Sequence, residues 1–112
     1  MKQIVAYVKP NKLPAVTLAL HKLEGLPGMS FSEVRGFGSD RIPKTEPIVQ
    51  DLVDYAPYTR IEILCADEQV SEIVLTIENA AHTGQSGDGK IYVLDVCRAI
   101  CIQTERQAEL VA

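Results

Sequence analysis

The stretch RIEILCADEQVSEIVLTIENAA, residues 60–81, decides the fold of this chain. In its first part Ile61, Ile63 and Cys65 alternate with other residues, which predicts a β-strand over residues 60–66. In its second part apolar residues recur at the spacing of an α-helix, with Asp67 as the expected N-cap. The residues of this helical stripe are Val70, Ile73, Val74 and Ile77, and Gly84 closes the helix. The stretch is therefore interpreted as a strand followed by a helix.

A similar strand and helix precede this stretch. Residues 2–8 are rich in β-forming side chains and end at Lys9-Pro10, which is a turn signal. Asn11 is the expected cap of the next helix, which should run to about Glu24. The apolar stripe of this helix consists of Leu13, Val16, Leu20 and Leu23.

Two further strands are expected, over residues 29–37 and over residues 90–102. The order of elements is then β-α-β-β-α-β. This order is typical of the ferredoxin-like α+β fold, in which an antiparallel sheet carries both helices on one face. Residues 1–112 are expected to form a single domain, with a C-terminal tail over 104–112.

Composition limits the classes of function. The chain has 112 residues, of which 46% are hydrophobic, and this is enough for one domain with a buried core. The net charge is −4 and no Lys/Arg cluster occurs, which argues against a nucleic-acid partner. No apolar run is long enough to cross a bilayer, so membrane insertion is not expected. We expect a cytoplasmic location and three free thiols.

Residues 39–59 form a long connection between two strands that a short turn could join. Loops of this length are usually functional or disordered. The segment contains three prolines and charges of both signs. Two interpretations stay open, a mobile hairpin tip and an arm that binds a partner.

The segment TGQSGDGK, residues 83–90, has three glycines within six residues and ends in Lys90. Such glycines let backbone N–H groups approach an anion closely, and a lysine adds positive charge. The match to a phosphate-binding P-loop is rejected, because Ile91 stands where Ser or Thr should hold magnesium and a strand follows where a helix should. Taken alone, the segment also fits a plain helix-to-strand turn.

Several motifs together resemble the PII signal-transduction family. Residues 83–93, which contain TG followed by GDGKIYV, resemble its C-terminal signature, and EVRGFG at 33–38 resembles the base of its long loop. The turn at residues 9–13 and the return strand within residues 53–63 are also similar. The resemblance extends from residue 1 to about residue 104.

The resemblance implies a non-enzymatic signalling protein that assembles as a homotrimer. An adenine nucleotide (ADP, AMP or ATP) would bind in clefts between neighbouring subunits. Residues 39–59 would be the effector loop, called the T-loop in this family, and would dock on a transporter or an enzyme. Carried over by position, the nucleotide-binding residues are Ser30, Gly36, Phe37, Gly38, Leu64, Thr83, Gly87, Asp88, Gly89 and Lys90, with Cys101 and Gln103 in the last strand.

Two departures from the family pattern bear on ligand affinity. Cys101 and Gln103 stand where the family usually carries two arginines that reach nucleotide phosphates. Without these guanidinium groups, triphosphate binding should weaken most, so ADP or AMP should be favoured over ATP. Whether magnesium accompanies the nucleotide stays open.

Other departures concern the effector. The family's modifiable tyrosine is missing near Gln50 and Asp51, and the carboxylate of Asp40 would repel 2-oxoglutarate. The pattern resembles divergent PII-like branches associated with bicarbonate uptake, carboxysomes or heavy-metal efflux. The alternative function is therefore a PII-like trimer with weakened nucleotide sensing that responds to bicarbonate or a metal ion.

The sequence favours structural cysteines and no catalysis. Cys97 and Cys101 are expected to lie on one face of the last strand and to pack in the core or at a subunit interface, and Cys65 should also be packed. No metal-ligand spacing and no catalytic triad is visible. A nucleotide-hydrolysing enzyme on the same fold is the least favoured hypothesis, and release of phosphate would support it.

Overall fold

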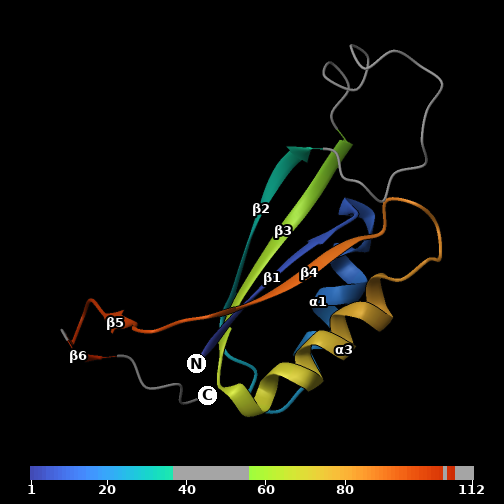
Figure 1. The fold of residues 1–112 in the computed structure, drawn as a ribbon. Helices are drawn as coiled ribbons and strands as arrows, with labels where there is room; N and C mark the ends of the chain where they lie inside the picture. The colour runs from blue at the N-terminus through green and yellow to red at the C-terminus, as the bar shows by residue number, and fades with distance from the viewer. Residues whose placement is uncertain (37–55, 105, 108–112) are drawn as a thin grey trace.

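A computed structural model describes residues 1–36, 56–104 and 106–107 of the chain (Figure 1). The helices and strands follow in the order β1 (Lys2–Val8), a 3₁₀ turn (Pro10–Lys12), α1 (Leu13–His21), β2 (Met29–Gly36), β3 (Ala56–Cys65), a second 3₁₀ turn (Asp67–Gln69), α3 (Val70–Ala81), β4 (Gly89–Asp95), β5 (Ile100–Cys101) and β6 (Arg106–Gln107).

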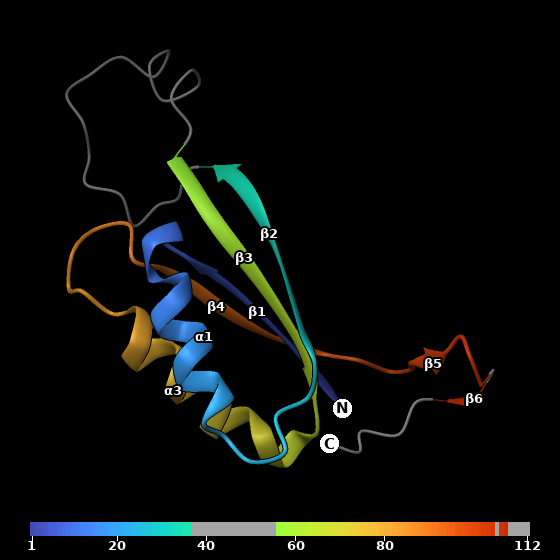
Figure 2. The ribbon, with the colours of Figure 1, turned by 180° about the vertical axis from the view of Figure 1, so that it is seen from behind.

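Four strands form one sheet in the order β2-β3-β1-β4, and every neighbouring pair is antiparallel. Helices α1 and α3 lie side by side on one face of this sheet, as the two opposite views agree (Figures 1 and 2). The opposite face of the sheet is not covered by any helix that the structure describes. This arrangement confirms the expected ferredoxin-like α+β fold.

The core lies between the sheet and the two helices. Alternate residues of the two central strands face the helices, as the sequence predicts, and Ile61, Ile63 and Cys65 are at most 1% exposed. The core consists of Ile4, Ala6, Val8, Val16, Leu20, Ile61, Ile63, Cys65, Ile73, Ile77 and Ala81. Burial of each large aliphatic side chain contributes about 1.5–3 kcal/mol, so this layer holds the helices on the sheet.

The predicted helix caps were wrong. The first helical segment starts with a 3₁₀ turn in which the N–H of Lys12 donates to the carbonyl of Lys9 at 2.9 Å, and Asn11 makes no cap. Asp67 is not the cap of α3, because its carboxylate is paired with the N-terminal ammonium group of Met1 at 2.6 Å. Asp67 pairs with a group far away in the sequence, which local capping rules do not consider. The turn before α1 depends instead on the rigid φ of Pro10.

Helix α1 also ends earlier than expected, at His21 rather than near Glu24. The N–H groups of Lys22 and Leu23 donate to the carbonyls of Ala19 and Leu20, which tightens the last turn. Leu23 still packs against the core although it lies beyond the helix.

The strand that follows the long loop starts earlier than predicted. Its first residues pair with β2, with Pro57 opposite Arg35 and Thr59 opposite Glu33. The last four residues of the predicted loop, 56–59, therefore belong to β3, and residues 39–55 lie outside the described residues.

The predicted strand over residues 90–102 is shorter in the structure, because β4 ends at Asp95. Asp95 pairs with Lys2, the first residue of β1, so no partner strand continues beyond it. The chain then leaves the sheet as an extended arm that carries β5 and β6 (Figures 1 and 2). Within the predicted tail, Arg106 and Gln107 form β6, whereas residues 105 and 108–112 lie outside the described residues.

The cysteines are reduced, as expected, but they are not all packed. Cys65 is fully buried in β3, which confirms the prediction. Cys97 and Cys101 are exposed on the arm of the single subunit, so they do not pack in its core, and the alternative of packing at a subunit interface stays a prediction. The reason is the early end of β4, which places both thiols beyond the sheet. Within the described ranges, no helix is both long and apolar enough to span a membrane.

Truncation of a core side chain in α3 should destabilise the fold. Ile77 is 0% exposed, whereas Leu75, two residues earlier on the same helix, is 57% exposed. We expect Ile77→Ala to lower the free energy of unfolding by about 2–5 kcal/mol, because it removes buried methyl groups and leaves a cavity. Leu75→Ala is the matched control and should change it by less than about 0.5 kcal/mol. Urea denaturation at a fixed protein concentration measures both, and equal losses would contradict this description of the core.

Candidate functional site

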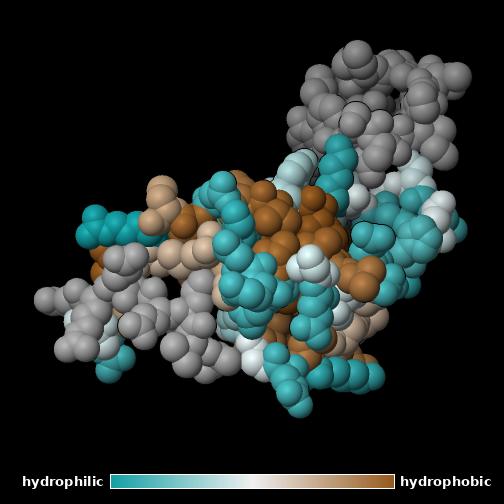
Figure 3. All heavy atoms as spheres, turned by 60° about the horizontal axis from the view of Figure 1, so that its bottom comes forward, coloured by the Kyte–Doolittle hydropathy of each residue, from teal (hydrophilic) through white to brown (hydrophobic). Residues whose placement is uncertain are grey.

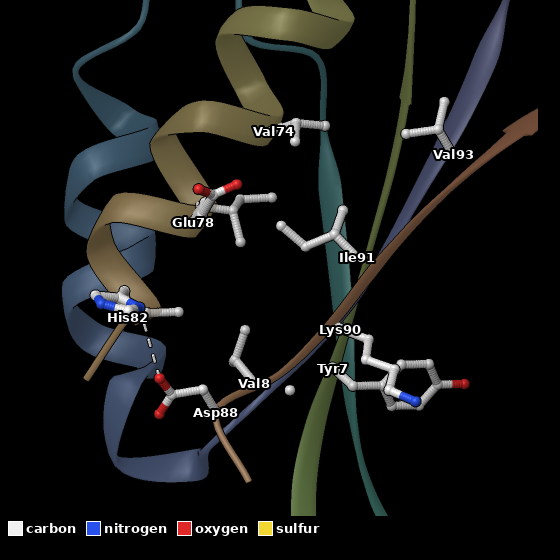
Figure 4. Close-up of a pocket in the computed structure, with 12 residues that line it drawn as sticks. Tyr7, Val8, Val74, Glu78, His82, Asp88, Lys90, Ile91 and Val93 are labelled. Atoms are coloured by element: carbon white, nitrogen blue, oxygen red, sulfur yellow. Dashed lines mark ion pairs between the residues drawn. The ribbon is translucent and has the colours of Figure 1, made fainter. Parts of the chain in front are cut away.

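A groove of about 370 Å³ runs between α3 and β4 at one edge of the sheet. Figure 4 shows Val74 and Ile91 directed into this groove from opposite sides, with His82 and Asp88 at one end. The apolar lining consists of Val8, Val74, Ile77, Ala81, Ile91 and Val93. The groove therefore combines an aliphatic interior with a polar end, as small-molecule sites generally do.

The polar end of the groove is the loop between α3 and β4, and the carboxylate of Asp88 holds this loop together. Its Oδ2 accepts hydrogen bonds from the backbone N–H groups of Thr83 at 2.8 Å and Gly84 at 2.9 Å. Its Oδ1 accepts a hydrogen bond from the Thr83 hydroxyl, which in turn accepts one from the N–H of Gln85 at 3.1 Å. One carboxylate thus fixes the first three residues of the loop.

Two basic side chains also approach Asp88. The ammonium group of Lys9, just beyond β1, lies 3.2 Å from Oδ1, and Nδ1 of His82 lies 3.7 Å from Oδ2 (Figure 4). The Thr83 hydroxyl and N–H, followed by the Gly84 N–H and Lys9, hold the pKa of Asp88 far below its ordinary value. Asp88 is therefore ionised at neutral pH, and its charge is compensated by its own loop and by Lys9.

The glycines of the loop are required by its backbone. Gly84, Gly87 and Gly89 have φ angles of 83°, 87° and 113°, a region that other residues rarely adopt. At Gly89 a Cβ atom would also lie 1.7 Å from the carbonyl oxygen of Tyr7 in the neighbouring strand. The spacing of glycines that the sequence shows is thus a steric requirement of this turn.

Lys90 follows the loop and is exposed. In Figure 4 its side chain lies beside Tyr7, on the side of β4 opposite to the groove-facing Ile91. The loop thus has the ammonium group of Lys9 at Asp88 and is followed directly in sequence by a second lysine, Lys90. A site of this composition suits an anionic group such as phosphate.

A second depression, of about 530 Å³, lies on strands β2 and β3 and contains Ser30 and Leu64. It is also lined by Gln3, Gly28, Met29, Glu62, Ile63 and Val96, and it shares no residue with the groove. Two of the residues predicted for the nucleotide site are therefore brought together here. They lie away from the loop between α3 and β4 that contains Gly84, Gly87 and Gly89, which we call the glycine loop.

Strand register gives the separation of the two depressions. Leu64 pairs with Gln3 of β1, whereas Gly89 pairs with Val8, five steps further along the same strand. At roughly 3.3 Å per residue this is about 17 Å. Ser30 lies on β2 and Gly89 on β4, and these two edge strands are separated by β3 and β1. The predicted residues thus form two separate groups on one subunit.

The remaining predicted residues lie elsewhere. Gly36 is the last residue of β2 and pairs with Ala56, at the end of the sheet where the glycine loop lies. Cys101 and Gln103 are exposed on the arm, beyond the opposite end of β4. The predicted residues Phe37 and Gly38 lie outside the described residues.

Sequence reasoning missed two residues at the glycine loop. Lys9 was assigned only to a turn, yet it pairs with Asp88 across 79 positions of sequence. Tyr58 was assigned to the long loop, yet its hydroxyl lies beside Gly87. Both residues lie in segments that resemble the family, but only strand register brings their side chains together at the loop. Among the described residues, no three His, Cys, Asp or Glu side chains gather as a metal site.

Comparison with known proteins identifies one family. The family described as "Nitrogen regulatory protein P-II" matches residues 1–106. The chain is 42% identical over 111 residues to the nitrogen regulatory protein P-II of Pasteurella multocida, covering 97% of each chain. It is 44% identical over 106 residues to the nitrogen regulatory protein P-II of Klebsiella oxytoca and to nitrogen regulatory protein P-II 1 of Escherichia coli K12, covering 93% of each chain.

The Asp88 carboxylate should give the fold a specific pH dependence. Because its pKa is lower in the folded chain than in the unfolded chain, it stabilises the fold fully above the unfolded value of about 4, and this contribution is lost as the pH falls below that value. Asp88→Asn should therefore lower the thermal unfolding midpoint near pH 7, and the difference from the parent should begin to shrink below about pH 4.

The control for this prediction is Asp95→Asn. Asp95 is 85% exposed and pairs with Lys2 at the surface, so its replacement should have little effect at either pH. A difference between Asp88→Asn and the parent that stays constant down to about pH 3 would contradict the role of the Asp88 charge.

Proposed function

The chain belongs to the nitrogen regulatory protein P-II family, and on that basis we propose that it binds an adenine nucleotide in clefts between subunits and thereby controls a partner protein. Members of this family are signalling proteins that bind small-molecule effectors, regulate partner proteins and are typically trimers. For this chain the proposed ligand is ADP, AMP or ATP, and the proposed partner is a transporter or an enzyme. The partner would be contacted through residues 39–59.

The observation that carries the nucleotide proposal is the glycine loop fixed by Asp88. The N–H groups of Thr83 and Gly84 donate to the Asp88 carboxylate, so the loop backbone is ordered before a ligand arrives and the N–H groups later in the loop are the candidate donors to phosphate. Asp88 is itself compensated by Lys9, and Lys90 adds a further positive charge at the loop. A rigid loop that presents backbone N–H donors beside a lysine binds phosphate at a low cost in conformational entropy.

A cleft between subunits is supported by the separation of the two depressions. A nucleotide that used the glycine loop of one subunit and the Ser30–Leu64 depression of the next would join the two groups of residues. Tyr92, Val93 and Leu94 of β4 are each between 45% and 49% exposed, and Ile102 on the arm is 91% exposed. Figure 3 shows apolar surface gathered in the middle of one face rather than scattered. A neighbouring subunit would cover such surface.

Control of a partner is supported by the strand residues that flank the long loop. Gly36 and Ala56, which stand on either side of residues 37–55 in the sequence, pair at the end of the sheet where Gly89 begins β4. A ligand at the glycine loop would therefore lie beside the base of this segment. Ordering of a loop by a bound ligand is a common way to switch a docking surface.

We propose no catalytic step. Asp88 is the carboxylate closest to the loop glycines, but both of its oxygens accept hydrogen bonds and its pKa is depressed. Such a group is a poor general base near neutral pH. Steady release of phosphate from ATP by the purified protein, abolished in Lys90→Ala, would overturn this assignment and support the hydrolase hypothesis.

The alternative function is a trimer that responds to bicarbonate or a metal ion. The neutral residues Cys101 and Gln103 favour it, because the arm lacks guanidinium groups for phosphate at these positions. Stabilisation by bicarbonate or a divalent cation, in the absence of nucleotide, would support this alternative. Stabilisation that requires ADP would support the main proposal.

Removal of the Lys90 ammonium group should weaken nucleotide binding. We expect Lys90→Ala to lower the affinity for ADP by about tenfold or more, because it removes a charge-assisted hydrogen bond to phosphate. The matched control is Lys22→Ala, which removes an exposed lysine just after α1, at the other end of the subunit. Calorimetric titration of the parent and both variants with ADP measures the effect. Equal affinities in all three proteins would contradict the proposed site.

A further inference from the structure

The side chain of Tyr58 reaches the glycine loop from another strand. Tyr58 lies on β3, and a methyl group placed on Gly87 would lie 3.7 Å from its phenol oxygen. The same methyl group would lie 3.9 Å from Cε of Lys9. Tyr58 and Lys9 therefore meet at Gly87, the central glycine of the loop.

This contact crosses the end of β1. Strands β3 and β4 are not neighbours, because β1 lies between them, and two strand spacings separate them by about 10 Å. Lys9 follows directly after β1, and its stem lies beside Gly87 as the Tyr58 hydroxyl does. The length of a tyrosine side chain is needed to bring a polar group from β3 to this point.

The hydroxyl group of Tyr58 is available to a ligand. Over residues 1–36 and 56–104, no hydrogen bond to this hydroxyl is formed, and the side chain is only partly buried. The Lys9 ammonium group, by contrast, is already paired with Asp88 at 3.2 Å. A phenol is neutral near pH 7 and donates one hydrogen bond.

We propose that Tyr58 binds the phosphate of the nucleotide, by donating a hydrogen bond from its hydroxyl to a phosphate oxygen held at Gly87. This proposal rests on the proposed nucleotide-binding function. It adds a residue from β3 that contacts phosphate to a site otherwise built from Lys9, the glycine loop and the start of β4. Because phenol is uncharged, Tyr58 strengthens binding of phosphate without adding another positive charge beside Lys9 and Lys90.

The test compares two variants that each lose a hydroxyl group. Tyr58→Phe removes the hydroxyl and keeps the ring. The control Ser71→Ala removes an exposed hydroxyl near the start of α3, at the end of the helix away from the glycine loop. ADP and adenosine are the probes, because adenosine has no phosphate. Calorimetric titration measures ADP directly, and competition against ADP measures adenosine.

Tyr58→Phe should lower the affinity for ADP by about tenfold and leave the affinity for adenosine within about twofold of the parent, because a hydrogen bond to a charged oxygen is lost. Ser71→Ala should match the parent for both ligands. If Tyr58→Phe binds ADP as the parent does, or loses ADP and adenosine equally, the assignment of Tyr58 to phosphate is overturned. If the parent protein binds neither ADP nor ATP, the proposed function itself fails and the assignment fails with it.

Discussion

The geometry of the candidate site depends on the carboxylate of Asp88. This group accepts the N–H groups of Thr83 and Gly84 and the hydroxyl of Thr83, and it pairs with Lys9. It thereby ties the end of α3 to the start of β4 and to the end of β1. The glycines permit the path of the loop, but the carboxylate selects one conformation from those that glycines allow. A loop fixed in this way presents its N–H groups without further ordering, and this is the physical basis for proposing a phosphate ligand.

Much of the fold was predictable from sequence because its signals are local. The alternation at Ile61, Ile63 and Cys65 and the helical spacing of Ile73 and Ile77 each identify a buried face, and the structure confirms both. Boundaries set by distant partners were not predictable. β4 ends at Asp95 because β1 begins at Lys2, and Asp67 is occupied by the N-terminal ammonium group.

The candidate site likewise contains residues that a local motif identifies and residues that only distant contacts bring together. The loop residues Thr83, Gly87, Asp88 and Gly89 are contiguous in sequence, and a motif could identify them. Lys9 and Tyr58 lie in other segments of the chain, and only strand register brings their side chains to the loop. Ser30 and Leu64 were placed in the same site by resemblance, and on one subunit they lie in a different depression. The expectation of a divergent PII-like branch stays a prediction, since the relatives described above carry nitrogen regulatory names.

The central claim is that the glycine loop of one subunit and the Ser30–Leu64 depression of another form one nucleotide site. The most direct measurement mixes two variants, Lys90→Ala and Ser30→Trp, each altered in a different half of the site. After joint unfolding and refolding of equal amounts of the two variants, about a quarter of all clefts combine two unaltered halves. The account predicts that each variant alone binds ADP more weakly than the parent, and that the mixture regains sites with the affinity of the parent. Absence of such sites in oligomers that native mass spectrometry shows to be mixed would contradict it.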